Sequence, residues 1–216
     1  MRQNTSHAVM AQRVEPVDSL EFFPTPPWAT RALIHDVLIP RRVPVADASV
    51  WEPAAGEGHM AETLREFFAR VHASDIHDYG RGYQVGSFVG DGLDAPDPKP
   101  HWIITNPPFN LGVSFVERAL REATCGVAMF VRTQFLETAG RWALFDRHPP
   151  ALIAQFAERV PIVKGRWDPR ASTATSYCWV IWQPKRTHSR VTEFMWIAPG
   201  ARRRHTRDDD VERFCK

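Results

Sequence analysis

The chain lacks the features that mark several classes of protein. It contains only three cysteines, Cys125, Cys178 and Cys215, which are too few and too far apart for a disulfide framework or a Cys-x-x-Cys metal pair. No apolar run approaches the length of a transmembrane span, so we expect no membrane partner. Residues 1–18 hold no apolar segment before a small-residue cleavage site, so we expect no secretory signal and a reducing, cytoplasmic location.

The chain also lacks a large excess of charge of either sign. The 27 lysines and arginines nearly balance the 25 aspartates and glutamates, which leaves a formal net charge of +2 at pH 7. Such a balance permits contact with nucleic acid without indicating it, so any phosphate-binding surface must come from local clustering of cations. With 216 residues, 44% of them hydrophobic, the chain is long enough for one domain with a core of its own.

We expect three parts along the chain. Residues 1–20 are polar and without periodicity, which is typical of a flexible N-terminal arm. Residues 21–198 are expected to form the folded domain. Residues 199–216 are a charged tail that we expect to be disordered, with a basic arm on DNA as the alternative.

Strand and helix patterns alternate through the domain. Apolar runs predict strands at 48–53, 70–76, just before Asp91, 101–105, 127–131, 151–156 and 177–182, with 192–198 as a candidate edge strand. Amphipathic runs predict helices at about 26–38, 59–70, 111–123 and 135–147. We therefore expect a mostly parallel α/β sheet with helices on both faces. One of the last strands should be antiparallel, because no helix separates them.

The stretch Ile103-Ile104-Thr105-Asn106-Pro107-Pro108-Phe109 organises the rest of the chain. Its apolar residues predict a buried strand, and the two prolines end it because neither has an N–H for the sheet. The result is a stiff loop at the carboxyl end of a strand, where open α/β sheets bind ligands. A chance Pro-Pro turn is the alternative. Asp, Asn or Ser followed by Pro-Pro and an aromatic should occur by chance in about one in a hundred chains of this length.

The residue types in this loop suit chemistry on the exocyclic amino group of a nucleobase. Such an amino group is a poor nucleophile because its lone pair is delocalised into the ring. The side-chain oxygen of Asn106 and the carbonyl oxygen of Pro107 are acceptors that would localise this lone pair. Phe109 would stack on the base and hold it flat.

A second ligand-binding pattern precedes this loop. A short strand ends in Glu52, and Ala54-Ala55-Gly56-Glu57-Gly58 then turns into a helix. Small residues at such a turn let a ligand approach the backbone, and Glu52 suits an ammonium better than a phosphate. Asp75 lies 19 residues after Gly56, which matches the acidic residue that binds ribose hydroxyls in doubly wound folds.

A metal site is the alternative for the polar residues around Asp75. The potential ligands are His72, Asp75, His77 and Asp78. His72 and Asp75 point to opposite faces of a strand, and no second cluster of ligands accompanies them. We therefore expect no metal.

Three other segments leave alternatives open. The segment from Phe22 to Trp28 predicts either a helix capped by Thr25 or a lid over a ligand. Asp91-Gly92 is either an acceptor for an adenine amino group or a plain Asp-Gly turn. The loop 159–176 is either solvated or contacts phosphates and stacks on bases through Trp167. Its candidate nucleic-acid-binding residues are Arg159, Lys164, Arg166 and Arg170.

Together, four stretches resemble the S-adenosylmethionine-dependent methyltransferases that modify adenine in DNA, especially small enzymes of phage and prophage type. The stretches are Phe23-Pro24-Thr25-Pro26-Pro27-Trp28, Glu52-Pro53-Ala54-Ala55-Gly56-Glu57-Gly58, Ser74-Asp75-Ile76 and Asn106-Pro107-Pro108-Phe109. The resemblance covers about residues 21–183. It implies a Rossmann-like class I methyltransferase fold, with a seven-stranded sheet whose last strand is antiparallel.

The resemblance also implies a cofactor, a partner and a site. The cofactor is S-adenosyl-L-methionine, and the partner is duplex DNA from which the target adenine is flipped. The implied catalytic residues are Asn106, Pro107, Pro108 and Phe109. The implied cofactor-binding residues are Pro24, Thr25, Trp28, Glu52, Pro53, Ala54, Ala55, Gly56, Gly58, Asp75, Ile76, Asp91, Gly92 and Asn106. Glu52 is expected near the methionine ammonium, Asp75 on the ribose and Asp91 near the cofactor adenine.

Other functions stay open at this point. Asn-Pro-Pro-Phe also occurs in enzymes that methylate the guanine amino group of ribosomal RNA, and close variants occur in enzymes that act on protein glutamine. A further alternative is a cofactor-dependent nucleic-acid-binding module without turnover, although such a module has no use for acceptors aimed at an amino group. A nucleotide-binding oxidoreductase is disfavoured because no full Gly-x-Gly-x-x-Gly is present. No segment of domain size is left for target recognition, and the sequence indicates no oligomeric state.

Overall fold

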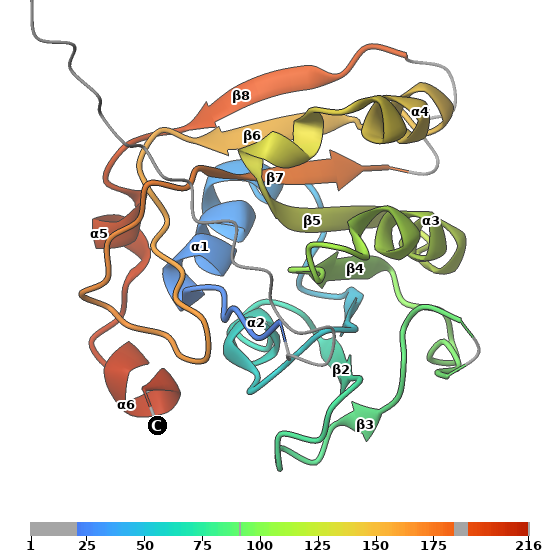
Figure 1. Cartoon of the computed structure of the whole chain (residues 1–216). Coiled ribbons are helices and arrows are strands. Elements are labelled where there is room, and N and C mark those ends of the chain that lie inside the picture. Colours follow the sequence, from blue (N-terminus) through green and yellow to red (C-terminus); the bar gives the residue numbers. More distant parts are fainter. Residues whose placement is uncertain (1–20, 91, 184–189, 216) are drawn as a thin grey trace, which may run out of the picture.

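The computed structural model describes residues 21–90, 92–183 and 190–215. The arm expected over residues 1–20 and the role expected for Asp91 lie outside the described residues. The described residues form a central sheet with helices on both sides (Figure 1).

The described residues form one mixed sheet of eight strands, in the order β3-β2-β1-β4-β5-β7-β6-β8. The strands are β1 (Ser49–Glu52), β2 (Arg70–Asp75), β3 (Gln84–Val85), β4 (Trp102–Thr105), β5 (Gly126–Arg132), β6 (Leu152–Phe156), β7 (Tyr177–Trp182) and β8 (Glu193–Ile197). β7 runs antiparallel to β5 and β6, and the other pairs are parallel. The expected fold class is confirmed: β7, the last of the seven strands that the resemblance implies, is antiparallel, and the candidate edge strand adds β8. The strand expected just before Asp91 lies earlier in the chain, at Gln84–Val85.

The strand order reverses between β1 and β4. From β1 the chain moves outward to β2 and β3, then returns to β4, which pairs with the other side of β1. Because neighbouring connections leave in opposite directions at this point, the carboxyl ends of β1 and β4 border a crevice. Glu52 ends β1 and Asp75 ends β2, while Asn106 directly follows β4.

Helices cover both faces of the sheet (Figure 1). The first face packs against α1 (Pro27–Ala32), its π-helical continuation η1 (Leu33–Leu38) and α2 (His59–Leu64). The second face packs against α3 (Gly112–Glu122) and α4 (Ala139–Arg147). Alternating side chains serve the two faces: Trp102 and Ile104 of β4 join the α1 side, and Ile103 joins the α3 side.

Three of the predicted helices differ from the structure in an end, in continuity or in a cap. α2 ends at Leu64 rather than at residue 70, since the chain must turn before β2 begins at Arg70. The predicted helix 135–147 is divided into the 3-10 turn η2 (Thr133–Leu136) and α4, with Thr138 at φ 97° between them. The expected Thr25 cap does not form, because Pro26 occupies the N-cap of α1 and no side chain caps this helix.

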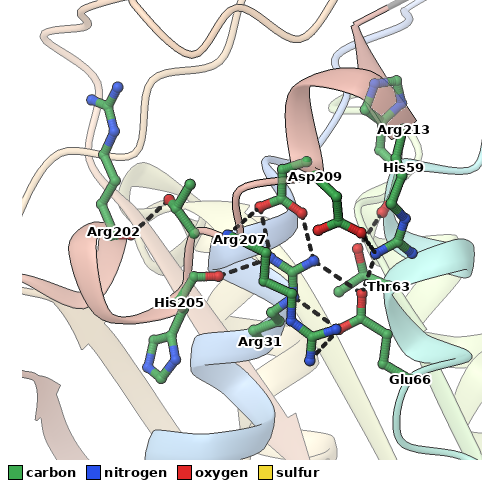
Figure 2. Close-up of polar contacts among 11 residues, drawn as sticks. Arg31, His59, Thr63, Glu66, Arg202, His205, Arg207, Asp209 and Arg213 are labelled. Carbon is green, nitrogen blue, oxygen red and sulfur yellow. Dashed lines mark hydrogen bonds and ion pairs between the residues drawn. The ribbon is translucent and has the colours of Figure 1, made fainter.

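The C-terminal tail is ordered over residues 199–215, so the expectation of disorder is wrong. It forms two short helices, α5 (Ala201–His205) and α6 (Asp210–Phe214). Asp210 is fully buried and pairs with the buried Arg31 of α1 at 2.6 Å. Glu66 binds the same guanidinium at 2.8 Å (Figure 2). A buried arginine needs anionic partners, and the acidic run of the tail supplies one of them.

Candidate active site

A cavity of about 290 Å³ lies at the carboxyl ends of β1, β2 and β4. This is the position at which open α/β sheets bind ligands. The segments that line it are 21–25, 52–56, 59–60, 75–76, 79, 87–88, 106–111 and 115.

The cavity brings together most of the site residues predicted from the sequence. Those that line it are Pro24, Thr25, Glu52, Pro53, Ala54, Ala55, Gly56, Asp75, Ile76, Asn106, Pro107, Pro108 and Phe109. The glycine turn and the Asn-Pro-Pro-Phe loop are distant in sequence, yet they form walls of the same cavity. Trp28, Gly58 and Gly92 do not line it.

The three predicted residues outside the cavity have structural surroundings that explain their positions. Trp28 is 2% exposed and packs edge-on against Phe156, so it belongs to the core beneath α1. Gly58, at φ 92°, is the N-cap of α2 and shapes the glycine turn rather than a cavity wall. Gly92 is exposed, and its backbone lies so close to Ser87 that a Cβ there would meet the Ser87 nitrogen at 2.8 Å.

Asp75 joins the end of β2 to the glycine turn. Its Oδ2 accepts a 2.8 Å hydrogen bond from the Gly56 N–H, and its Oδ1 accepts one of 2.9 Å from the His77 N–H. Burial raises the pKa of Asp75, and these backbone hydrogen bonds oppose that rise. Each carboxylate oxygen keeps a lone pair beyond its backbone bond, so a ligand hydroxyl can still donate to Asp75.

Glu52 is the most buried carboxylate of the cavity wall, at 1% exposure. Among the described residues its Oε1 has no hydrogen-bond partner, and neither has the buried hydroxyl of Thr25. Burial raises the pKa of Glu52 well above its ordinary value, and the nearby Asp75 carboxylate raises it further. An acceptor of this kind lacks a counter-charge, which a cationic ligand group would supply.

Residues 21–25, called here the lid segment, lie across the predicted catalytic loop. The Asn106 side-chain nitrogen donates a 2.8 Å hydrogen bond to the Phe23 carbonyl, and the Phe109 N–H donates one of 2.7 Å to Glu21 Oε2. The rings of Phe23 and Phe109 lie 5.0 Å apart. These contacts support the lid alternative for this segment over that of a simple capped helix.

Several cavity residues were not predicted as site residues. They are Glu21, Phe22, Phe23, His59, Met60, Tyr79, Ser87, Phe88, Asn110, Leu111 and Phe115. Phe22 and Phe23 directly precede the Pro-Thr-Pro-Pro stretch, which is a signal that could have found them. His59 gave no such signal, because its partner is the Phe214 carbonyl of α6, which binds its Nε2 at 3.0 Å. Burial lowers the pKa of His59 to about 4, so its imidazole is neutral at pH 7.

The loop 159–176 contacts the lid segment. The Gly165 N–H donates a 2.8 Å hydrogen bond to the Phe22 carbonyl. The predicted nucleic-acid-binding side chains are all exposed: Arg159, Lys164, Arg166 and Arg170. Trp167 is only 6% exposed and packs edge-on against Phe214, so the structure does not support the alternative in which it stacks on a base. The loop presents cations beside the lid segment but no exposed tryptophan.

No described helix is long and apolar enough to cross a membrane. In the same part of the chain, no group of three His, Cys, Asp or Glu side chains is arranged to hold a metal ion.

Solved structures of other proteins share the fold of this chain. No protein-family model matches the chain, and no curated protein matches it. The modification subunit assigned to a type I restriction enzyme of Vibrio vulnificus YJ016 matches with a TM-score of 0.54 at 13% identity, over 91% of this chain and 52% of that one. This chain therefore spans about half the length of that subunit.

Two further solved structures match over most of their own length. A protein assigned as an RNA methyltransferase from Pyrococcus horikoshii has a TM-score of 0.53 at 16% identity, over 79% of this chain and 91% of that one. A protein assigned as a hemolysin from Lactococcus lactis has a TM-score of 0.50 at 9% identity, over 74% and 88%. The chain thus has the fold of Rossmann-like methyltransferases.

Proposed function

We propose that this protein transfers a methyl group from S-adenosyl-L-methionine to the exocyclic amino group of adenine in DNA. One observation carries the proposal: the Asn106-Pro107-Pro108-Phe109 loop and the turn around Gly56 line the same cavity, in a methyltransferase fold. The first suits an amino group and the second suits the cofactor. Their shared cavity would bring the two reactants together.

The residues of the cavity fit this cofactor by their chemistry. The buried, unpartnered Oε1 of Glu52 suits the methionine ammonium, and the buried hydroxyl of Thr25 suits the methionine carboxylate. Asp75 suits the ribose hydroxyls. When bound, S-adenosylmethionine supplies an electrophilic methyl group on its sulfonium.

The chain itself would align and polarise the acceptor. Among the described residues, no hydrogen bond occupies the Asn106 Oδ1 or the Pro107 carbonyl oxygen, so both can accept from an amino group. These bonds would localise the nitrogen lone pair toward the methyl group, and Phe109 would hold the base flat. Because the methyl group is already electrophilic, alignment should supply much of the acceleration.

The choice of DNA rests on weaker support than the choice of cofactor. The Vibrio vulnificus match is assigned to a restriction enzyme, and the exposed cations of the loop 159–176 lie beside the lid segment and suit phosphates. The Pyrococcus horikoshii match is assigned to RNA, which makes RNA the second candidate. A binding module without turnover is less well supported, because it would not need the unoccupied acceptors of Asn106 and Pro107.

The proposal is tested by product analysis. The full chain is incubated with methyl-labelled S-adenosylmethionine and unmethylated duplex DNA, and the DNA is digested to nucleosides. We expect the label in N6-methyladenine, and we expect almost none with the Asn106→Ala variant. Label in another nucleoside, or equal labelling by the variant, would overturn the proposal.

A further inference from the structure

A second pocket, of about 140 Å³, adjoins the Asn-Pro-Pro-Phe loop. It shares Pro107, Pro108 and Phe109 with the main cavity and extends to the end of β5 and the start of α4. The other lining residues are Gly112, Phe130, Val131, Arg132, Gln134, Phe135 and Arg141. This lining contains two arginines and no carboxylate, so it suits an electron-rich or anionic ligand.

The planar guanidinium of Arg132 covers the Phe109 ring at the border of this pocket. The Cζ of Arg132 lies 3.7 Å from the centre of that ring, and the ring of Phe23 lies 5.0 Å from it. Arg132 is the last residue of β5, and its Nε is buried without a hydrogen-bond partner among the described residues. A guanidinium with an unused donor thus stacks on the aromatic ring that we assign to the acceptor base.

We propose that this second pocket receives the acceptor nucleotide and that Arg132 stacks on the face of its base opposite Phe109. The inference rests on the proposed function and names the part of the site that holds the substrate. Both aromatic rings and guanidinium planes stack on nucleobases. The base would enter between the two side chains, and the guanidinium would move away by about 3.5 Å, one van der Waals layer.

The chemistry of the pocket favours a nucleotide over a protein substrate. A glutamine side chain offers neither a ring to fill the space between Phe109 and Arg132 nor a phosphate for the second arginine, Arg141. A nucleotide offers both. It also offers ring-nitrogen or phosphate acceptors for the unpartnered Nε of Arg132.

Binding to two oligonucleotides tests this role without any turnover. The full chain, saturated with S-adenosylhomocysteine, is titrated into fluorescent 12-mers, one of deoxyadenylate and one that carries only abasic sites. Stacking needs a base, whereas a purely electrostatic contact needs only the phosphates. We expect Arg132→Met to weaken binding of the deoxyadenylate 12-mer about tenfold and binding of the abasic 12-mer about twofold.

Two further variants complete the design. Arg132→Lys keeps the charge but loses the flat plane, so we expect wild-type binding of the abasic 12-mer and about fivefold weaker binding of deoxyadenylate. Arg147→Met is the matched control, since Arg147 is exposed on α4 and lies outside both pockets. It should bind both 12-mers as the wild type does. The lysine variant keeps the test valid if Arg132→Met fails to fold.

The outcomes separate this inference from the proposed function. Equal losses on the two 12-mers, or a lysine variant that binds deoxyadenylate like the wild type, would overturn the stacking role. Methylation of adenine by the wild type, together with such equal losses, would overturn this inference alone. Base-dependent binding without methylation of DNA would overturn the proposed function and leave the stacking role in place.

Discussion

The side-chain nitrogen of Asn106 donates a 2.8 Å hydrogen bond to the carbonyl oxygen of Phe23, 83 residues earlier in the chain. A second bond, from the Phe109 N–H to Glu21, joins the same two segments at 2.7 Å. The first bond fixes which way the Asn106 amide is turned, because only its nitrogen can donate. Its oxygen is thereby left for the amino group of the substrate.

This relationship predicts different effects for two substitutions of Asn106. Asn106→Ala removes the acceptor, so we expect kcat to fall at least about 100-fold, while the Kd for S-adenosylmethionine changes less than about threefold. Asn106→Asp keeps an acceptor but loses the donor to Phe23, so we expect a smaller loss, of about tenfold. Steady-state transfer to DNA and calorimetric titration of the cofactor measure both quantities. Comparable losses in turnover and cofactor binding would count against the assigned role.

We expect the charge of Glu52 to lower the free energy of unfolding of the ligand-free protein, although the same charge binds the cofactor. Its pKa lies well above the ordinary value because burial disfavours its charge. The folded protein therefore holds this proton more tightly than the unfolded chain does. As a result, the free energy of unfolding contributed by Glu52 falls as the pH rises from 4.5 towards the raised pKa.

Glu52→Gln should remove this pH dependence. We expect the Tm of the ligand-free variant to exceed that of the wild type by about 3 °C at pH 8 and to match it at pH 4. We also expect cofactor affinity to fall at least about tenfold, since a neutral amide cannot balance the ammonium. Thermal unfolding at the two pH values and calorimetric titration check both effects. A variant with unchanged cofactor affinity would contradict the role of Glu52.

The Arg31–Asp210 pair predicts that the tail stabilises the domain. Asp210→Asn leaves the guanidinium of Arg31 with one fewer buried anion, although Glu66 still binds it at 2.8 Å (Figure 2). We expect a loss of about 3 kcal/mol in the free energy of unfolding. Asp209→Asn is the matched control, because the Asp209 side chain is 56% exposed, and it should cost less than about 0.5 kcal/mol. Urea unfolding measures the free energy of unfolding of both variants. Equal losses would show that the buried pair contributes no more stability than the exposed Asp209 does.

Arg118 should act on cofactor binding through the loop that it holds. From α3 it donates hydrogen bonds to the carbonyl oxygens of Phe88, Gly90 and Leu93, and Phe88 lines the main cavity. Arg118→Ala leaves these carbonyls without their donor, so we expect about 2 kcal/mol of lost stability and a five- to tenfold weaker Kd for the cofactor. Turnover at saturating cofactor should change less than about threefold.

The exposed Arg121 provides the control for that substitution. It lies on the same helix, and its side chain donates a hydrogen bond to the Glu117 carbonyl of that helix. Arg121→Ala should therefore leave the Kd for the cofactor unchanged. If Arg118→Ala lowered turnover at saturation without changing that Kd, the loop would have a role other than cofactor binding.

Much of the fold and the site could be predicted because local rules decide them. Two prolines end β4 at Thr105, and small residues after Glu52 form the turn at Gly56, whatever the rest of the chain does. The alternation of apolar strands and helices then limits the topology. These local features place Asn106 and Glu52 at neighbouring strand ends.

The errors at the C-terminal tail and at two tryptophans concern residues whose role depends on distant partners. The charge run of the tail predicts disorder, but Arg31, 179 residues away, binds Asp210 and holds the tail in place. Trp28 and Trp167 follow or precede turn-like residues, yet both are buried against aromatic rings from other segments. Local sequence cannot separate a loop tryptophan that meets a ligand from one that closes a core, because the difference lies in the packing partner.

The most direct test of the central claim is a competition among three acceptors. Unmethylated duplex DNA, ribosomal RNA and a protein lysate are each incubated with the wild-type protein and methyl-labelled S-adenosylmethionine, and the label is traced to a nucleoside or amino acid. We predict label in N6-methyladenine of the DNA, well above the other two pools. Label confined to guanine of RNA or to protein glutamine would contradict the claim about the substrate. No label in any pool would contradict the claim of turnover.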